Sequence, residues 1–134
     1  MPDPSDMQLG PKVVLMDEFS ASDGDIFPYR FKMDGLGKLI GKRSWGGVVG
    51  IRDTLPIVDG GFLNRPEFGP YSKDGKEWPV EGHGVDPDIV VDNDPAKEFA
   101  GVDQQLDRGI EEILLELKTK GQAMPPPPPF PDRS

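Results

Sequence analysis

Three features of this 134-residue sequence predict an α/β fold. An apolar run over residues 13–16 lies between turn-forming residues and has the length of a buried strand. A helical segment after Ser22 leads to a second short strand at 38–40, and strand–helix–strand is the smallest unit of a parallel sheet. Further along, apolar residues recur at helical spacing on one face of a long segment. The length suits one modest domain with a single core.

The turn and helix over residues 17–32 organise the rest of the chain. The first strand is predicted over 12–16, and Ser22 lies where the chain turns from this strand into the helix. Pro28 falls inside the helix, where proline removes a hydrogen bond and costs roughly 3 kcal/mol. We therefore expect the helix to bend at Pro28, or its regular part to begin near it. Gly35 and Gly37 are typical of a helix C-terminus.

A glycine-rich loop, GKRSWGGVVG, occupies residues 41–50. Its Gly-Lys pair does not complete a phosphate-binding loop, because Leu36 and Arg43 stand where glycine and Ser or Thr are required. No nucleotide cofactor is therefore predicted. Short β segments are expected after the strand at 38–40, separated by turn signals. These segments are 48–51, 56–58, 61–63 and 78–81, and residues 84–91 end in a further strand.

Helix signals dominate the chain after residue 93. Asp94 is predicted to cap a helix with Pro95 at its first position, and Asp103 to cap the long amphipathic helix, which Gly121 ends. We expect the apolar face of this helix to pack on the sheet, and a subunit contact is the alternative. That face comprises Val102, Leu106, Ile110, Ile113, Leu114 and Leu117. Residues 1–11 are interpreted as a leader or linker remnant and residues 122–134 as a proline-rich tail.

The composition excludes several classes of function. A net charge of −9 argues against nucleic-acid or anionic-membrane partners, and it is typical of solubility or of attracting basic peptides. The absence of cysteine excludes disulfides and thiolate metal sites. No apolar run has membrane-spanning length, and no signal peptide is visible, so a cytoplasmic location is expected. The spacing of Asp86, Asp88, Asp92 and Asp94 does not match a calcium loop, and no metal is predicted.

Ser22 is the candidate nucleophile. It lies at a strand-to-helix turn, where the positive end of a helix faces the group that the serine attacks. The amide of Asp23 can then point at a developing oxyanion, as in the nucleophile elbow of hydrolases. A serine before a helix is more often an N-cap, and Ser20 is the nearest rival for the nucleophile.

Four ordered blocks of the sequence, DEFSASDGD, LGKLIGKRSWGGVVGI, VEGHGVDPDI and PFPDRS, resemble the catalytic part of the tricorn protease family. These are serine peptidases related to the C-terminal processing, or tail-specific, proteases. The resemblance extends from about Lys12 to the end of the chain. It implies part of a crotonase-like (spiral ββα) peptidase domain over residues 12–121, and peptide hydrolysis by acyl-enzyme chemistry without a cofactor.

The resemblance also implies roles for single residues. Ser22 matches the catalytic serine, and Asp23 matches the residue whose amide forms part of the oxyanion hole. Glu81 matches a glutamate that orients the catalytic base through a hydrogen bond. Arg43 and Trp45 stand in a block near the active site and are expected to line the substrate groove, although Trp45 is equally suited to packing.

A general base is the missing component. A serine hydroxyl needs one to accept its proton, and the family takes a histidine from far upstream of the serine. The twenty-one residues before Ser22 contain none. His83, the only histidine, is expected on the surface, and an approach to Ser22 is the alternative. The base is thus expected from an upstream catalytic half or a homo-oligomer. An inactive peptide- or partner-binding module is the alternative function.

Overall fold

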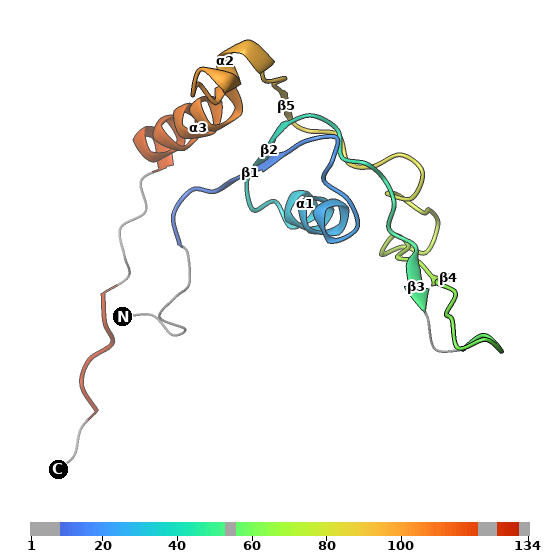
Figure 1. Ribbon diagram of the computed structural model, residues 1–134. Coiled ribbons are helices and arrows are strands. Elements are labelled where there is room, and N and C mark those ends of the chain that lie inside the picture. The colour runs from blue at the N-terminus through green and yellow to red at the C-terminus, as the bar shows by residue number, and fades with distance from the viewer. Residues whose placement is uncertain (1–8, 53–55, 121–125, 132–134) are drawn as a thin grey trace.

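The computed structural model describes residues 9–52, 56–120 and 126–131, and it confirms the predicted mixed α/β class. Two helices pack around a small sheet, from which a two-stranded ribbon projects (Figure 1). In chain order the elements are β1 (Val13–Met16), α1 (Asp23–Met33), β2 (Lys38–Gly41), β3 (Gly50–Arg52), β4 (Arg65–Phe68), β5 (Ile89–Val90), α2 (Pro95–Phe99) and α3 (Gln104–Lys120).

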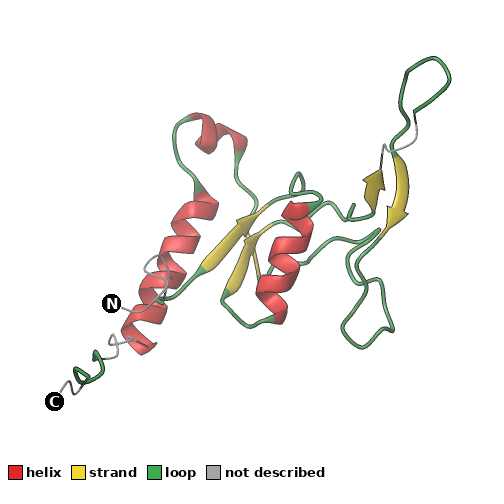
Figure 2. Cartoon of the chain, turned by 90° about the horizontal axis from the view of Figure 1, so that it is seen from below, coloured by secondary structure: helices red, strands yellow, loops and turns green. Residues whose placement is uncertain are grey.

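The central sheet has three parallel strands in the order β1-β2-β5. Val14 is paired with Leu39, and Ile40 with Ile89, so apolar residues meet across both ladders. Helix α1 covers one face of the sheet and α3 lies on the other (Figure 2). Because parallel strands need crossover connections, the β1–α1–β2 unit that the sequence predicted is the centre of the fold.

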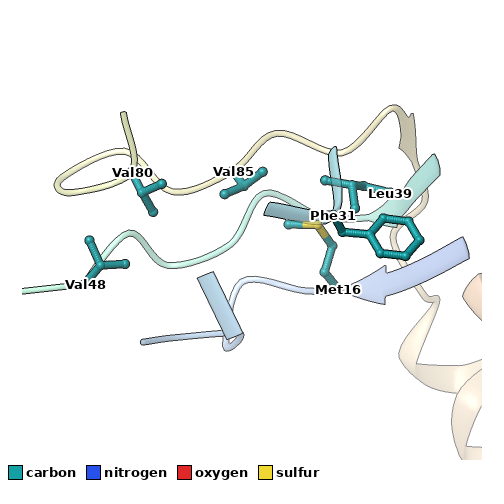
Figure 3. Packing of buried hydrophobic residues seen from close by; sticks show 6 residues of the cluster. All are labelled: Met16, Phe31, Leu39, Val48, Val80 and Val85. Atoms are coloured by element: carbon teal, nitrogen blue, oxygen red, sulfur yellow. The ribbon is translucent and has the colours of Figure 1, made fainter. Parts of the chain in front are cut away.

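The hydrophobic core lies between the sheet and α1 and continues into the neighbouring loops (Figure 3). Burying a side chain of this size contributes about 1.5–3 kcal/mol. The cluster therefore holds the loops after β2 and before β5 against the sheet. Its six members are Met16, Phe31, Leu39, Val48, Val80 and Val85.

Helix α1 is regular from Asp23 onward and contains Pro28 in its interior. The expectation that its regular part begins near Pro28 is therefore wrong. Pro28 is buried, and packing compensates for the one hydrogen bond that proline removes. The predicted C-terminal signal is confirmed, because Gly35 has φ +63° and the Leu36 amide donates to the Phe31 carbonyl at 3.1 Å.

The segment between β2 and β5 differs from the prediction in three places. Strand β4 was not predicted, because Pro66 lowers strand propensity, although proline is tolerated in an edge strand. The expected strands at 56–58 and 61–63 reduce to one isolated bridge between Pro56 and Phe62. The expected strand at 78–81 is wrong, because the chain turns there and the Gly84 amide donates to the Val80 carbonyl at 2.8 Å.

The two predicted caps near the C-terminal helices are confirmed. The Asp94 side chain accepts a hydrogen bond from the Ala96 amide at 2.8 Å, and Asp103 accepts one from the Leu106 amide at 3.0 Å. The bond from the Leu106 amide lowers the pKa of Asp103. The predicted stop at Gly121 lies outside the described residues.

Helix α3 packs on the sheet through small and charged residues rather than through its apolar face. A Cβ on Gly109 would lie 3.1 Å from a methyl carbon of Leu15, so the helix and β1 approach closely there. The Glu112 side chain is 8% exposed and pairs with Lys38 and Arg108, each at 2.5 Å. The predicted docking of this helix on the sheet is thus confirmed, but most of its apolar face is exposed and does not cover the sheet.

Helix docking through Glu112 is expected to make stability depend on pH. The hydrogen bond from Lys38, supported by Arg108, lowers the pKa of Glu112 below its ordinary value of 4.5. A depressed folded-state pKa contributes stability that is complete above the unfolded value and is lost as the pH falls through the folded one. Urea unfolding between pH 7 and pH 3 should therefore show a flatter decline for Glu112→Gln than for the wild type. Equal slopes would contradict this role.

Of the helices in the described residues, none combines the length and the apolar content that a bilayer crossing needs. Residues 126–131, which are the described part of the predicted proline-rich tail, are exposed and lie outside any helix or strand.

Candidate active site

The turn between β1 and α1 presents Ser22 in a strained backbone conformation. Ser22 has φ +56° and ψ −110°, and every other described residue with positive φ is a glycine. A non-glycine residue in this region costs on the order of 1–3 kcal/mol, and such strain concentrates at functional sites. The side chain is exposed at the N-terminus of α1. This is the arrangement of a nucleophile elbow.

Ser20, the rival candidate, is engaged in the turn itself. Its hydroxyl donates to Asp17 Oδ1 at 3.1 Å, and its amide donates to the same oxygen at 2.9 Å. Its carbonyl accepts a hydrogen bond from the Trp45 amide at 2.9 Å. Ser20 therefore shapes the loop that leads to Ser22, and the two serines are structurally distinct.

Asp25 belongs to the candidate site, and the sequence analysis missed it. It is fully buried, and its Oδ2 accepts from the Ser22 amide at 3.0 Å. Oδ1 accepts from the Gly46 amide at 2.8 Å, and Oδ2 also accepts from the Gly47 amide at 3.1 Å. The Ser-x-x-Asp spacing, related to a capping box, was the signal available in the sequence. Asp25 thereby ties the backbone of Ser22 to the glycine-rich loop.

Asp23 opens helix α1 directly after the serine. Within the described residues its amide has no hydrogen-bond acceptor, as expected for the first turn of a helix. The N-terminus of a helix carries a partial positive charge. The free amide is therefore chemically suited to an oxyanion formed at Ser22.

Glu81 is anchored to the end of the glycine-rich loop. Its Oε2 accepts hydrogen bonds from the amides of Val48 and Val49, at 2.7 Å and 3.0 Å. In the part of the chain that the structure describes, the other carboxylate oxygen has no hydrogen-bond partner. Glu81 thus has a fixed position and one oxygen available to a further donor.

Two loops are joined into one support for the site. Ser44 is buried and makes two hydrogen bonds with Val85. The Ser44 amide donates to the Val85 carbonyl at 3.1 Å, and the Ser44 Oγ accepts from the Val85 amide at 2.8 Å. The Gly82 amide donates to the Gly46 carbonyl at 2.8 Å. Through Asp25 this support is connected to Ser22, so residues distant in sequence form one hydrogen-bonded network.

The remaining predicted site residues lie on the same loops. The Arg43 guanidinium donates to the His83 carbonyl, and Trp45 is 65% exposed. His83 Nε2 lies 2.8 Å from Asp86 Oδ2 on the surface. None of the hydrogen bonds or ion pairs among the described residues brings His83 to Ser22.

A groove and a cleft lie beside this network. The groove has a volume of about 350 Å³ and is mainly apolar. The residues that line it are Val49, Pro66, Glu67, Phe68, Gly69, Trp78 and Glu81. The cleft, of about 820 Å³, lies at the carboxyl ends of β1 and β2 and includes Ser20.

Lys42 pairs in the cleft with two acidic residues, Glu18 and Asp92. The hydrogen bond between Lys42 and Glu18 lowers the pKa of Glu18 and raises that of Lys42. The described residues contain no group of three or more side chains suited to a metal ion.

A strained serine at a helix N-terminus, with a free amide beside it, is an arrangement that hydrolases with a nucleophilic serine use. Comparisons with known proteins identify the family of this chain. The model of Peptidase family S41 matches residues 3–91. Tricorn protease from Thermoplasma volcanium is 44% identical over 117 residues, which is 87% of this chain and 11% of that protein. Tricorn protease from Thermoplasma acidophilum is 40% identical over 127 residues, which is 95% of this chain and 12% of that protein.

Solved structures give the same result. The crystal structure of the tricorn protease matches with a TM-score of 0.75 at 43% identity, over 81% of this chain and 11% of that one. The photosystem II D1 C-terminal processing protease matches with a TM-score of 0.50 at 25% identity, over 61% of this chain and 20% of that one. The chain therefore belongs to Peptidase family S41 and is a homologue of tricorn protease. It spans only 11–12% of the length of these two tricorn relatives.

Proposed function

We propose that this chain carries the nucleophile of a serine peptidase that hydrolyses peptides through an acyl-enzyme. The observation that carries the proposal is the positive φ of Ser22 at the N-terminus of α1, fixed by the buried Asp25. Ser22 Oγ attacks the scissile carbonyl carbon, its proton passes to a general base, and the carbonyl oxygen becomes an oxyanion. When this tetrahedral intermediate collapses, the peptide C–N bond breaks and the protonated base gives its proton to the leaving amine. Water then hydrolyses the resulting acyl-enzyme and releases the carboxylic acid.

The neighbouring residues support the steps around this attack. The free Asp23 amide stabilises the oxyanion, and the unpaired oxygen of Glu81 orients the base. The apolar groove beside Glu81 receives a substrate side chain, and the exposed Arg43 and Trp45 contact the peptide near it. The domain to which these residues belong is crotonase-like in this proposal, and it works without a cofactor.

The general base comes from outside this chain in the proposed mechanism. His83 is bonded to Asp86 and is the only histidine in the sequence. An upstream catalytic half, or another subunit of a homo-oligomer, would supply the histidine. The isolated chain is therefore expected to be an incomplete enzyme. Its cytoplasmic location remains a prediction from the sequence.

A second function has one observation in its favour. None of the hydrogen bonds or ion pairs among the described residues joins Ser22 to His83, which is the only histidine in the sequence. A module that binds peptides in the apolar groove without cleaving them fits this observation. The strain at Ser22 favours the peptidase, because simple peptide binding does not require a serine in that conformation.

Prolonged exposure to a fluorophosphonate probe separates these functions. We expect a slow covalent adduct in the wild type, located on Ser22 by tandem mass spectrometry. Ser20→Ala is the matched control and should label at the wild-type rate, because the Ser20 hydroxyl is engaged by Asp17. Ser22→Ala should reduce labelling by at least about 100-fold. An adduct on another residue, or complete inertness of Ser22 over days, would instead support the binding module.

A further inference from the structure

Helix α3 carries a continuous apolar surface that is left exposed. We name as the α3 stripe the residues Leu106, Ile110, Leu114 and Leu117, whose exposed fractions are 47%, 47%, 52% and 47%. Their spacing of four, four and three places them on one helical face. Between Leu106 and Leu117 the stripe is about 16 Å long at 1.5 Å per residue. An apolar surface of this kind on a helix is typical of an interaction site.

The α3 stripe and the sheet-facing side of the helix are different surfaces. The side that meets the sheet carries Gly109, which lies against Leu15, and the buried Glu112, which pairs with Lys38. Rotating α3 to bury the stripe on the sheet would break both contacts. Within the described part of this chain, the stripe is therefore left exposed by the way α3 docks on the sheet.

Charges beside the α3 stripe indicate what fits on it. Asp107 lies beside its N-terminal half and Lys118 beside its C-terminal half, on the same flank of the helix by their angular positions. Within the described residues, neither has an ion-pair partner. When two such helices pair antiparallel, equivalent flanks meet, and Asp107 of one comes beside Lys118 of the other. A parallel pair would not bring these charges together.

We propose that the α3 stripe binds the α3 stripe of a second copy of this chain, with the helices antiparallel about a twofold axis. Leu106 and Ile110 of one copy pack against Leu117 and Leu114 of the other. Such an interface is self-complementary and closes as a dimer. This proposal does not depend on the peptidase function, because it uses no residue of the Ser22 network.

Sedimentation equilibrium over a range of concentrations tests the dimer. Ile110→Glu should weaken dimerisation by at least about 100-fold, because it places a charge at the centre of the apolar contact. Phe99→Glu is the control, since Phe99 is 96% exposed on α2 and lies outside the stripe, and it should leave the dimer intact. Circular dichroism confirms that each variant is folded.

A charge exchange tests the orientation. Asp107→Lys and Lys118→Asp should each weaken the dimer by about 3- to 10-fold, and the double variant should restore it to within about threefold of the wild type. A folded wild-type chain that stays monomeric at high concentration would overturn the proposal and leave a segment outside this chain as the occupant. A dimer that Ile110→Glu leaves intact would overturn it too, as would a double variant weaker than either single one.

Discussion

Replacing Asp25 with alanine is expected to destabilise the protein by about 3 kcal/mol or more and to abolish labelling of Ser22. Three amides, those of Ser22, Gly46 and Gly47, would lose their shared acceptor, the fully buried Asp25 carboxylate, and the Gly46 amide is itself buried. Each buried donor left unpaired costs about 1–3 kcal/mol. Without the bond to the Ser22 amide, the strained conformation of the serine also loses the contact that fixes it.

Urea unfolding and fluorophosphonate labelling of Asp25→Ala measure these two effects separately. The neighbouring Asp23→Ala is the control, because only the backbone amide of Asp23 has a proposed role. It should lose no more than about 1 kcal/mol, from the weaker interaction with the helix dipole. If Asp25→Ala unfolds at the same urea concentration as Asp23→Ala, the network centred on Asp25 does not hold the site.

Replacing Gly84 with alanine is the second large effect that we expect, at about 3 kcal/mol or more. Gly84 has φ +86°, and an added Cβ would lie 2.1 Å from the Ser44 carbonyl oxygen. The position of the Cβ is fixed by the Gly84 backbone, and the oxygen belongs to the Ser44 backbone. No side-chain rotation can therefore relieve this contact. The substitution would separate the glycine-rich loop from the turn that carries Glu81.

Gly82 provides a control within the same turn. It has φ +77°, but no atom lies within 4 Å of an added Cβ. Gly82→Ala should therefore cost only about 1 kcal/mol, which is the backbone strain alone. Thermal unfolding of the two variants distinguishes the steric effect from the conformational one. Equal losses of stability would show that the close approach of Gly84 to Ser44 is unimportant.

Local signals explain which parts of the fold were predictable. The apolar run at 13–16, the cap residues Asp94 and Asp103 and the glycine at 35 each act within a few residues, and the structure confirms them. Strand β4 contains Pro66, and its pairing with β3 depends on a partner distant in sequence. Residues 78–81 resemble a strand in composition, but the glycines that follow turn the chain.

In the candidate site, too, the residues in contiguous motifs were predictable, and the residue that depends on distant partners was not. Ser22 and Asp23 belong to one contiguous motif, and Glu81 to a second one, so both were found in the sequence. The role of Asp25 depends on Gly46 and Gly47, which only the folded chain brings to it. Periodicity correctly identified the apolar face of α3. It carried no information on whether the sheet covers that face, so packing on the sheet and a subunit contact stayed open as alternatives until the structure showed the face exposed.

Chemical rescue with imidazole tests most directly the claim that Ser22 is a nucleophile whose base lies outside this chain. The rate of fluorophosphonate labelling would be measured at pH 7.5 with increasing imidazole, for the wild type, His83→Ala and Ser22→Ala. We expect the rate at Ser22 to rise with neutral imidazole in the first two proteins alike, and no labelling in the third. If the labelling rate does not change with imidazole concentration and His83→Ala abolishes labelling, the account is contradicted, because His83 would then be the base.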